Sequence, residues 1–154
     1  MGPQALAGAV TAVYVDANVF LYAIGGESPY RESCRALIDA IRRRRIRGET
    51  SVTTLEEVVH HRRRRGDATA IARGREVARI CSKVHPLDRA LSLSALAVAE
   101  RHPALGIGDA IHVATALAHG LQAVVSADRD FDAVQGVERI DPLDRNAVAA
   151  LASE

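Results

Sequence analysis

Acidic side chains recur in this sequence at points where a strand is expected to end or a helix to begin. They are Asp16, the adjacent pair Glu56 and Glu57, Asp109 and Asp128. Ligands of a parallel α/β sheet bind at the carboxyl ends of its strands and at the helix starts beside them. We therefore expect these carboxylates to meet at one edge of a sheet. Such a cluster suits hard cations such as Mg²⁺ or Mn²⁺, which can activate a water and stabilise charge on a phosphate.

Each acid also has a purely structural explanation. Asp16, Asp109 and Asp128 suit helix caps. The pairs Thr53–Glu56 and Thr54–Glu57 both fit a capping box. For one position taken alone we favour this explanation. For all four together we favour the metal site, because they fall on the same kind of corner while spread over most of the chain.

Five short stretches predict strands, the first of them apolar and β-prone. They are AVYVD (12–16), TSVT (50–53), KVHPLD (83–88), LQAVVS (121–126) and GVERID (136–141). Amphipathic spacing and capping residues predict helices between them. These run from Ser28 to about Arg45, from Thr53 or Thr54 to about Gly66, over 68–82, from Asp88 to before Pro103, and from near Asp109 to Gly120. Alternating strands and helices of this length imply a parallel sheet with helices on both faces.

Two details of these elements follow from their spacing. In the helix that starts near Asp109, the small inner face is expected to comprise Ile111, Ala114, Thr115 and Ala118. His112 lies one turn after Asp109 and could face the acids, but we favour a structural histidine. The phrase PLDR occurs at 86–89 and 142–145, and each copy reads as a turn from a strand into a helix.

Composition limits the class of protein. A chain of 154 residues with 48% hydrophobic and 25% charged residues is expected to form one soluble domain. Its two cysteines, Cys34 and Cys81, exclude a disulfide framework and a Cys-rich zinc site and agree with a reducing cytoplasm. The apolar stretch ALAGAVTAVYV lacks the charged leader of a signal peptide. No apolar run approaches the roughly 18 residues of a membrane helix. We expect a cytoplasmic protein without membrane contact.

Charge is distributed unevenly along the chain. Residues 31–79 hold 14 arginines against seven acids, although the whole chain has a net charge of only +1. Arginine suits bidentate contact with phosphate, so a nucleic-acid partner is consistent with this pattern. Solvated helix faces explain the composition equally well.

Four segments resemble the PIN-domain nucleases, and among them the VapC-like toxins of bacterial toxin–antitoxin pairs. They are VYVDANVFLYAI, TSVTTLEEVVHHRRRRGD, LGIGDAIHVATALAHGL and VVSADRDF. The order of Asp16, Glu57, Asp109 and Asp128, with spacings of 41, 52 and 19 residues, makes the combination specific. The resemblance implies a PIN-like three-layer α/β/α sandwich around a central, mainly parallel sheet. It implies one domain over 12–141, with an N-terminal extension (1–11) and a C-terminal helical tail (142–154) packed on the same domain.

The resemblance also assigns the acids. The catalytic acids of the family fall on Asp16, Glu57, Asp109 and Asp128, around one or two Mg²⁺ or Mn²⁺ ions. The choice of Glu57 over Glu56 depends on the resemblance, because helical periodicity does not distinguish them. The closing T-x-D-x-D-F motif falls on Ser126, Asp128, Asp130 and Phe131. The expected metal ligands are Asp16, Asp109, Asp128 and Asp130.

Residues around the acids complete the expected site. Asn18 and the hydroxyl of Ser126 would support it, whereas Ala17 replaces the usual threonine and removes a hydroxyl. Asp132 lies beyond the motif and is expected to be solvated, and Phe131 to pack in the core. Two basic runs are candidates for binding RNA. They are Arg42, Arg43, Arg44 and Arg45, and Arg62, Arg63, Arg64 and Arg65.

The leading hypothesis is therefore a metal-dependent endoribonuclease that acts as the toxin of a toxin–antitoxin pair, hydrolysing RNA with a metal-activated water. A small antitoxin protein and a homodimer are the partners that the resemblance implies. One alternative is an Mg²⁺-dependent phosphatase or phosphotransferase with Asp16 as nucleophile and Lys83 beside the phosphoryl group. Another is a non-catalytic RNA-binding module.

Overall fold

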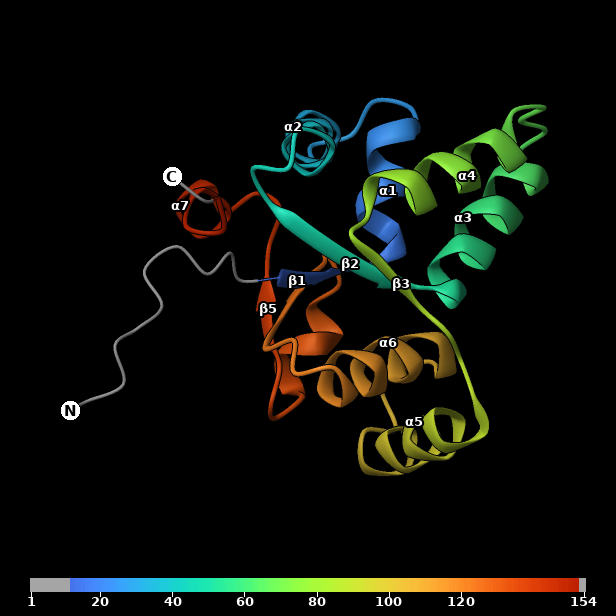
Figure 1. The fold of residues 1–154 in the computed structure, drawn as a ribbon, viewed down its shortest axis with the longest axis vertical. Coiled ribbons are helices and arrows are strands. Elements are labelled where there is room, and N and C mark those ends of the chain that lie inside the picture. The colour runs from blue at the N-terminus through green and yellow to red at the C-terminus, as the bar shows by residue number, and fades with distance from the viewer. Residues whose placement is uncertain (1–11, 153–154) are drawn as a thin grey trace.

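The computed structural model describes residues 12–152, which form a parallel sheet between two layers of helices (Figure 1). The strands are β1 (Ala12–Val15), β2 (Arg47–Ser51), β3 (Lys83–His85), β4 (Ala123–Val125) and β5 (Glu138–Ile140). They lie in the order β3-β2-β1-β4-β5, and all neighbours are parallel. The predicted three-layer α/β fold is confirmed, and the last strand, β5, lies at an edge of the sheet.

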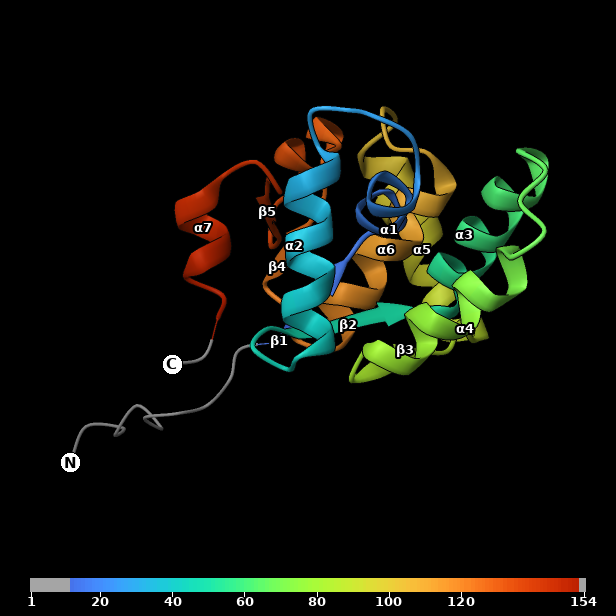
Figure 2. The same ribbon diagram turned by 90° about the horizontal axis from the view of Figure 1, so that it is seen from above.

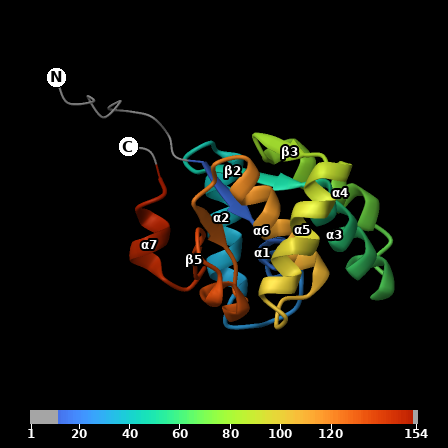
Figure 3. The ribbon, with the colours of Figure 1, turned by 90° about the horizontal axis from the view of Figure 1, so that it is seen from below.

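Helices cover both faces of the sheet. They are α1 (Ala17–Ile24), α2 (Arg31–Arg42), α3 (Val52–Arg64), α4 (Ala70–Ile80), α5 (Arg89–Arg101), α6 (Ile107–Ala118) and α7 (Arg145–Ala149), with a 3₁₀ turn, η1, at Arg129–Ala133. Helices α1 to α4 and α7 lie on one face, and α5 and α6 on the other (Figures 1 and 3). Each layer encloses its own hydrophobic core.

Alternation along β1 assigns side chains to these two cores. Val13 and Val15 face the core beneath α1 to α4, whereas Tyr14 faces the core beneath α5 and α6. All three side chains are fully buried. A tyrosine in such a place needs a hydrogen-bond partner for its hydroxyl, and this requirement matters at the site described below.

The second strand differs from the prediction at 50–53. It begins at Arg47 and ends at Ser51, and α3 begins at Val52, so Glu57 lies in the second turn of this helix and not in the first. The strand is polar, so its first residues, Arg47 to Glu49, were not recognised as part of it. Its Glu49 is buried because the side chain accepts a hydrogen bond from His85, at 2.7 Å.

The segment after β1 also contains a helix that we did not predict. Helix α1 begins at Ala17, directly after Asp16, and crosses the face of the sheet between α2 and α3 (Figure 2). Its apolar residues show no polar face that would indicate a helix. Helix α2 begins at Arg31 and not at Ser28, whose hydroxyl accepts a hydrogen bond from the Tyr30 backbone N–H in the preceding turn.

The repeated PLDR turns behave as predicted. Asp88 accepts a hydrogen bond from the Leu91 N–H and caps α5, and Asp144 accepts one from the Ala147 N–H and caps α7. The predicted inner face of α6 is wrong in part: Ala118 is exposed and Ile111 only half-buried. Helix α6 lies between the sheet and α5, so both of its flanks are buried, and a single apolar stripe cannot describe it.

The tail and the termini complete the fold. Helix α7 packs on the core of α1 and α2 through Ala147 and Val148. The extension predicted at 1–11 and the last two residues of the tail lie outside the described residues. Cys34 and Cys81 are buried free thiols. Between residues 12 and 152, no helix is long and apolar enough to cross a membrane.

Candidate active site

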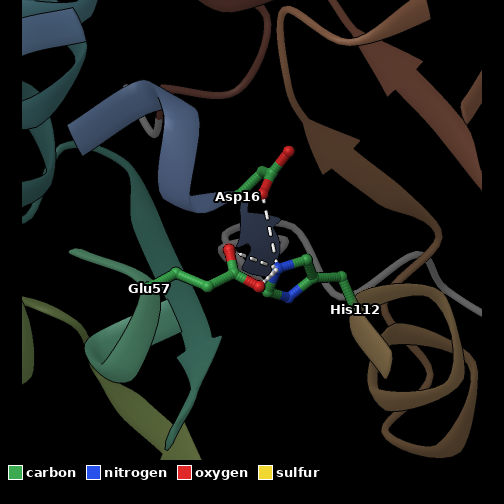
Figure 4. Close-up of side chains that lie close together, drawn as sticks. All are labelled: Asp16, Glu57 and His112. Atoms are coloured by element: carbon green, nitrogen blue, oxygen red, sulfur yellow. Dashed lines mark hydrogen bonds and ion pairs between the residues drawn. The ribbon is translucent and has the colours of Figure 1, made fainter. Parts of the chain in front are cut away.

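Three side chains from three different elements meet at the carboxyl edge of the sheet (Figure 4). Asp16 follows the last residue of β1, Glu57 extends from α3, and His112 extends from α6. The Nε2 atom of His112 lies 3.2 Å from both carboxylate oxygens of Glu57 and 3.5 Å from Oδ1 of Asp16. The ligand atoms of the three residues all lie within 4.8 Å of one another, so the group could hold a metal ion.

The carboxylate of Asp16 is held from the opposite side by Ser126. The Ser126 hydroxyl donates to Oδ2 of Asp16 at 2.7 Å. The same oxygen accepts hydrogen bonds from the Asn18 side-chain amide and from the Asp128 backbone N–H, both at 3.0 Å. With both acceptor positions filled, the hydroxyl proton is directed at Asp16. Asn18 and Ser126 thus lie where the sequence led us to expect supporting residues.

Arg139 fixes the end of β4 that carries this hydroxyl. Its guanidinium donates to the backbone carbonyl of Ser126 at 3.1 Å. It also pairs with Asp132 at 2.8 Å and with Asp141 at 3.4 Å. Asp132 is exposed, as expected, and its carboxylate is also ion-paired with Arg139. This arginine comes from edge strand β5, and we did not predict its contribution.

The structure distinguishes between the two adjacent glutamates. Glu56 is exposed, whereas Glu57 reaches His112 with a side chain that is 34% exposed. Glu57 passes close to the first turn of α6, where Gly108 leaves room for it. A Cβ atom at Gly108 would lie 2.8 Å from Oε1 of Glu57, which is closer than real side chains approach. The GIGD segment therefore admits the carboxylate as well as beginning the helix.

His112 is linked to the interior of the sheet by its other nitrogen. The hydroxyl of Tyr14 lies 2.5 Å from Nδ1 of His112 and 2.8 Å from the hydroxyl of Ser51. All three residues are buried. The histidine has both nitrogens hydrogen-bonded, as we expected of a structural residue, but two of its neighbours are site carboxylates. The sequence signals were its position one turn after Asp109 and a tyrosine within an apolar strand.

Burial and like charges raise the pKa values of two aspartates. Burial raises the pKa of Asp16 above its usual 3.8, and Glu57 adds to this effect, while His112 and the Ser126 hydroxyl oppose it. Burial, followed by the charge of Asp16, raises the pKa of Asp109 to about 7, and Asp128 contributes in the same direction. Asp109, in the first turn of α6, is thus an electrostatic neighbour of both aspartates.

The pKa of His112 is raised to about 10. Burial acts against the charged ring, but Tyr14, Glu57 and Asp16 together outweigh this cost. An imidazolium donates from both nitrogens, so it can donate to Glu57 from Nε2 and to Tyr14 from Nδ1. The ring therefore compensates part of the negative charge that the carboxylates bring together.

The two aspartates of the last motif differ in placement. Asp128 is half-buried and caps η1, where its carboxylate accepts a hydrogen bond from the Asp130 backbone N–H at 2.9 Å. It is thus both a helix cap and a neighbour of Asp109. Asp130 is exposed, and no contact in the described chain joins its carboxylate to the other acids. Its role as a metal ligand stays a prediction. Phe131 is fully buried, as predicted.

The two arginine runs lie at different places. Arg42 to Arg45 precede β2, at the amino edge of the sheet, whereas the acids lie at its carboxyl edge. A five-residue strand is about 16 Å long, so this run is not beside the acids. Its members Arg42 and Arg43 pair with acids of α2 and α4. Arg62 to Arg65 end α3, the helix that carries Glu57.

The structure offers no support for a phosphatase that would use Lys83. This residue begins edge strand β3, in register with Glu49 of β2. Strand β2 separates it from β1, and neighbouring strands lie about 4.8 Å apart. Through Glu49, Lys83 is level with Tyr14, two residues before Asp16. No hydrogen bond or ion pair joins the lysine to Asp16 in the described structure, so the phosphatase alternative gains no geometric support.

The donor set fits a hard divalent cation. Carboxylate oxygens are the ligands that Mg²⁺ and Mn²⁺ prefer, and the raised pKa of Asp109 reflects negative charge that a cation would balance. The carboxylate of Asp16 is oriented by its hydrogen bond from Ser126, and the backbone of Asp109 is fixed in the first turn of α6. The arrangement suits metal-assisted hydrolysis of a phosphate ester.

Comparisons with known proteins agree with this arrangement. The family profile described as "PIN domain" matches residues 13–137. Ribonuclease VapC7 of Mycobacterium tuberculosis is 37% identical over 132 residues, which are 84% of this chain and 91% of that protein. The crystal structure of Mycobacterium tuberculosis VapC20, described as a sarcin-ricin loop cleaving toxin, superposes with a TM-score of 0.67 at 20% identity, covering 79% of this chain and 93% of that one.

A second solved structure, described as a toxin–antitoxin complex from Klebsiella pneumoniae, gives a TM-score of 0.63 at 18% identity. It covers 84% of this chain and 97% of that one. At this level of identity the two structures show the shared fold. The first relative is similar enough to show the family as well.

Proposed function

Because the chain belongs to the PIN-domain family and, within it, to the VapC ribonucleases, we propose that it is a metal-dependent endoribonuclease and the toxin of a toxin–antitoxin pair. The observation that carries this proposal is the meeting of Asp16 and Glu57 at the carboxyl edge of the sheet, with Asp109 as their electrostatic neighbour. These acids are far apart in sequence, and packing them together is costly unless a bound cation balances the repulsion that His112 leaves uncompensated.

Each side chain has a distinct task in this proposal. Asp16, Asp109 and Asp128 hold one or two Mg²⁺ or Mn²⁺ ions, with Asp130 as a candidate outer ligand. When bound, the metal supplies Lewis-acid stabilisation of the phosphate charge and lowers the pKa of a water. Glu57, the more exposed of the two acids around His112, accepts a proton from the attacking water. Ser126 and His112 keep the carboxylates oriented.

We also propose a small antitoxin protein as the partner that restrains the enzyme, as the Klebsiella complex suggests. An antitoxin could inhibit by covering the carboxylates or by neutralising them with a basic side chain. Association of two copies of the chain and residence in the cytoplasm stay predictions from the family resemblance.

The test is cleavage of total RNA by the purified protein with Mg²⁺, Mn²⁺ or EDTA, followed by mapping of the cut ends. Cutting should require the metal, and Asp16→Asn and Asp109→Asn should each reduce it by at least about 100-fold. Circular dichroism of both variants should match the parent. Lys83→Ala is the matched control and should cut normally. Cutting that persists in EDTA would contradict the chemistry, and RNA binding without cutting would favour a non-catalytic module.

A further inference from the structure

The arginines at the end of α3 differ in whether they form ion pairs with acidic side chains. Arg62 pairs with Asp67 at 2.8 Å, and both side chains are mostly buried. Arg63, Arg64 and Arg65 are exposed and make no ion pair within residues 12–152. The last turn of α3 therefore presents positive charge that the described part of the protein does not balance.

A cavity of about 450 Å³ opens beside this turn. It lies between the end of α3 and the end of α1, and the loop 25–28 closes one side. Its charged lining side chains are Arg62, Arg65 and Glu27, and Asn18, Tyr22 and His61 line it as well. Asn18 connects the cavity to the acids, because its amide donates to Ser126, and Ser126 donates to Asp16.

Arg62 and Arg65 outnumber Glu27 in the lining, and Arg63 and Arg64 are exposed on the same turn, so the balance of charge favours an anion. Burial lowers the pKa of His61, and the charges of Arg65, Arg62 and Arg64 lower it further, so the ring is neutral among cations. Its Nδ1 atom is buried without a hydrogen-bond partner in the described structure. A bound phosphate would balance the arginines and could accept hydrogen bonds from this group of side chains.

An aromatic side chain lies in the same cavity. Tyr22 stacks on Tyr30, with ring centroids 4.8 Å apart and planes 25° apart, so its ring is held in one orientation. It also lines the cavity. A fixed aromatic ring near a cationic group is the combination with which proteins hold single-stranded nucleic acid.

We propose that this cavity binds a nucleotide of the RNA strand next to the phosphodiester that is cut. Arg65 and His61 contact the phosphate, and Tyr22 contacts the base. The inference rests on the proposed function, since it takes RNA as the substrate. It assigns substrate binding to the end of α3 and not to the run Arg42–Arg45.

The variants that test it are Arg65→Ala and Tyr22→Leu, with Arg89→Ala and Tyr22→Phe as controls. Arg89 is an exposed arginine in α5, in the other helix layer, and is free of ion pairs in the described structure. Arg65→Ala should raise the KM for RNA about tenfold while kcat stays within about twofold, as expected when one charge-assisted phosphate contact is lost. Tyr22→Leu should do the same and Tyr22→Phe should not, because phenylalanine retains the aromatic ring.

A binding assay provides a readout that does not depend on cleavage. It measures the fluorescence anisotropy of a fluorescein-labelled single-stranded RNA oligonucleotide at several salt concentrations. Arg65→Ala should weaken binding and reduce the slope of log affinity against log salt by about one, whereas Arg89→Ala should not. Equal RNA affinities and equal salt dependence of Arg65→Ala and Arg89→Ala would overturn the proposal that the cavity binds RNA.

The two proposals fail in different ways. A parent protein that binds the oligonucleotide through Arg65 without cutting it refutes the nuclease and supports the cavity. If the parent protein cuts RNA and the Arg65→Ala variant cuts it with the same KM, RNA binding in the cavity is refuted and the nuclease is supported. If Arg65→Ala cuts RNA normally but escapes inhibition by a co-purified antitoxin, the cavity belongs to the protein partner instead.

Discussion

The hydroxyl of Tyr14 lies 2.5 Å from Nδ1 of His112, inside the layer formed by the sheet, α5 and α6. The same hydroxyl reaches Ser51 at 2.8 Å, so one buried chain of hydrogen bonds runs from the end of β2 to the carboxylate of Glu57. The orientation of a site residue is thus set by a side chain that never reaches the solvent. Tyr14 therefore stabilises the site without contacting the substrate.

Replacing Tyr14 with phenylalanine should destabilise the protein by about 1–3 kcal/mol, because Nδ1 of His112 and the Ser51 hydroxyl would be buried without their partner. Urea unfolding followed by circular dichroism measures the change. Tyr22→Phe is the control, since no hydrogen bond joins its hydroxyl to the described residues, and it should stay within about 0.5 kcal/mol of the parent. If Tyr14→Phe lowers the free energy of unfolding no more than Tyr22→Phe does, the buried hydrogen bonds of Tyr14 contribute little to stability.

The contribution of Asp109 to the stability of the metal-free protein should be lost as the pH rises from about 4 to about 7. His61 and His119 act in the opposite direction because their pKa values are lowered, so the contribution is measured as the difference between the parent and Asp109→Asn. The pKa of Asp109 is raised from 3.8 to about 7, so the folded state binds this proton more tightly than the unfolded chain. The stabilisation is complete below the unfolded pKa and is lost as the pH passes the folded one. Asp67 titrates outside this window, because hydrogen bonds from Thr69 and Arg62 hold its pKa well below the usual range.

Added Mn²⁺ should reverse this trend, because the ion binds the ionised carboxylates. The gain in Tm from Mn²⁺ over EDTA should be larger at about pH 8 than at about pH 5. Thermal melts across this range measure both effects. Asp109→Asn should flatten the pH dependence and reduce the gain from the metal. A gain that is independent of pH would show that proton release from Asp109 is not coupled to metal binding.

Gly108→Ala should reduce activity more than stability. The new Cβ atom would lie 2.8 Å from Oε1 of Glu57, so the glutamate has to leave its position beside His112. A loss of about 10-fold or more in kcat is expected if Glu57 takes up the proton from water. Gly106→Ala is the matched control, because no other atom lies within 4 Å of a Cβ built there. Equal rates for both variants would place Glu57 outside the reaction.

Gly74→Ala should destabilise the packing of α3 on α4. Its Cβ atom would lie 2.6 Å from a methyl group of Val59, and overpacking of this kind costs about 1–3 kcal/mol. The double variant with Val59→Ala removes the opposing methyl groups and should recover most of the loss. Urea unfolding of the two single variants and the double variant tests this coupling. Additive losses would mean that the clash is relieved by other movements.

Much of the fold could be predicted because its strands bury short apolar runs and its helices carry recognisable caps. Asp88 and Asp144, in the two PLDR turns, are clear examples. The meeting of the acids followed from one rule, that ligands gather at the carboxyl ends of parallel strands. The start of strand β2 and the whole of helix α1 were missed for opposite reasons: the first is polar because Glu49 is buried with a partner, and the second has no polar face.

Side-chain partners were harder to predict than elements. Whether His112 is structural or part of the site depends on Tyr14 and Glu57, which approach it from different segments, and spacing along one helix cannot show that. The run Arg42–Arg45 looked equivalent to Arg62–Arg65 by composition. Its position before a strand and not after one already indicated the amino edge of the sheet, and this signal was available from the predicted order of elements.

The hydrogen bond between Ser126 and Asp16 joins residues that are 110 positions apart. Strand β4, which ends beside Ser126, lies between β1 and β5, so the middle of the sheet closes only when the last third of the chain has been made. A growing polypeptide that has not yet reached this serine has its first aspartate but nothing to orient it. Synthesis must therefore proceed through residue 126 before the Asp16 carboxylate can be oriented, which makes assembly of the site a late event in the life of the nascent chain.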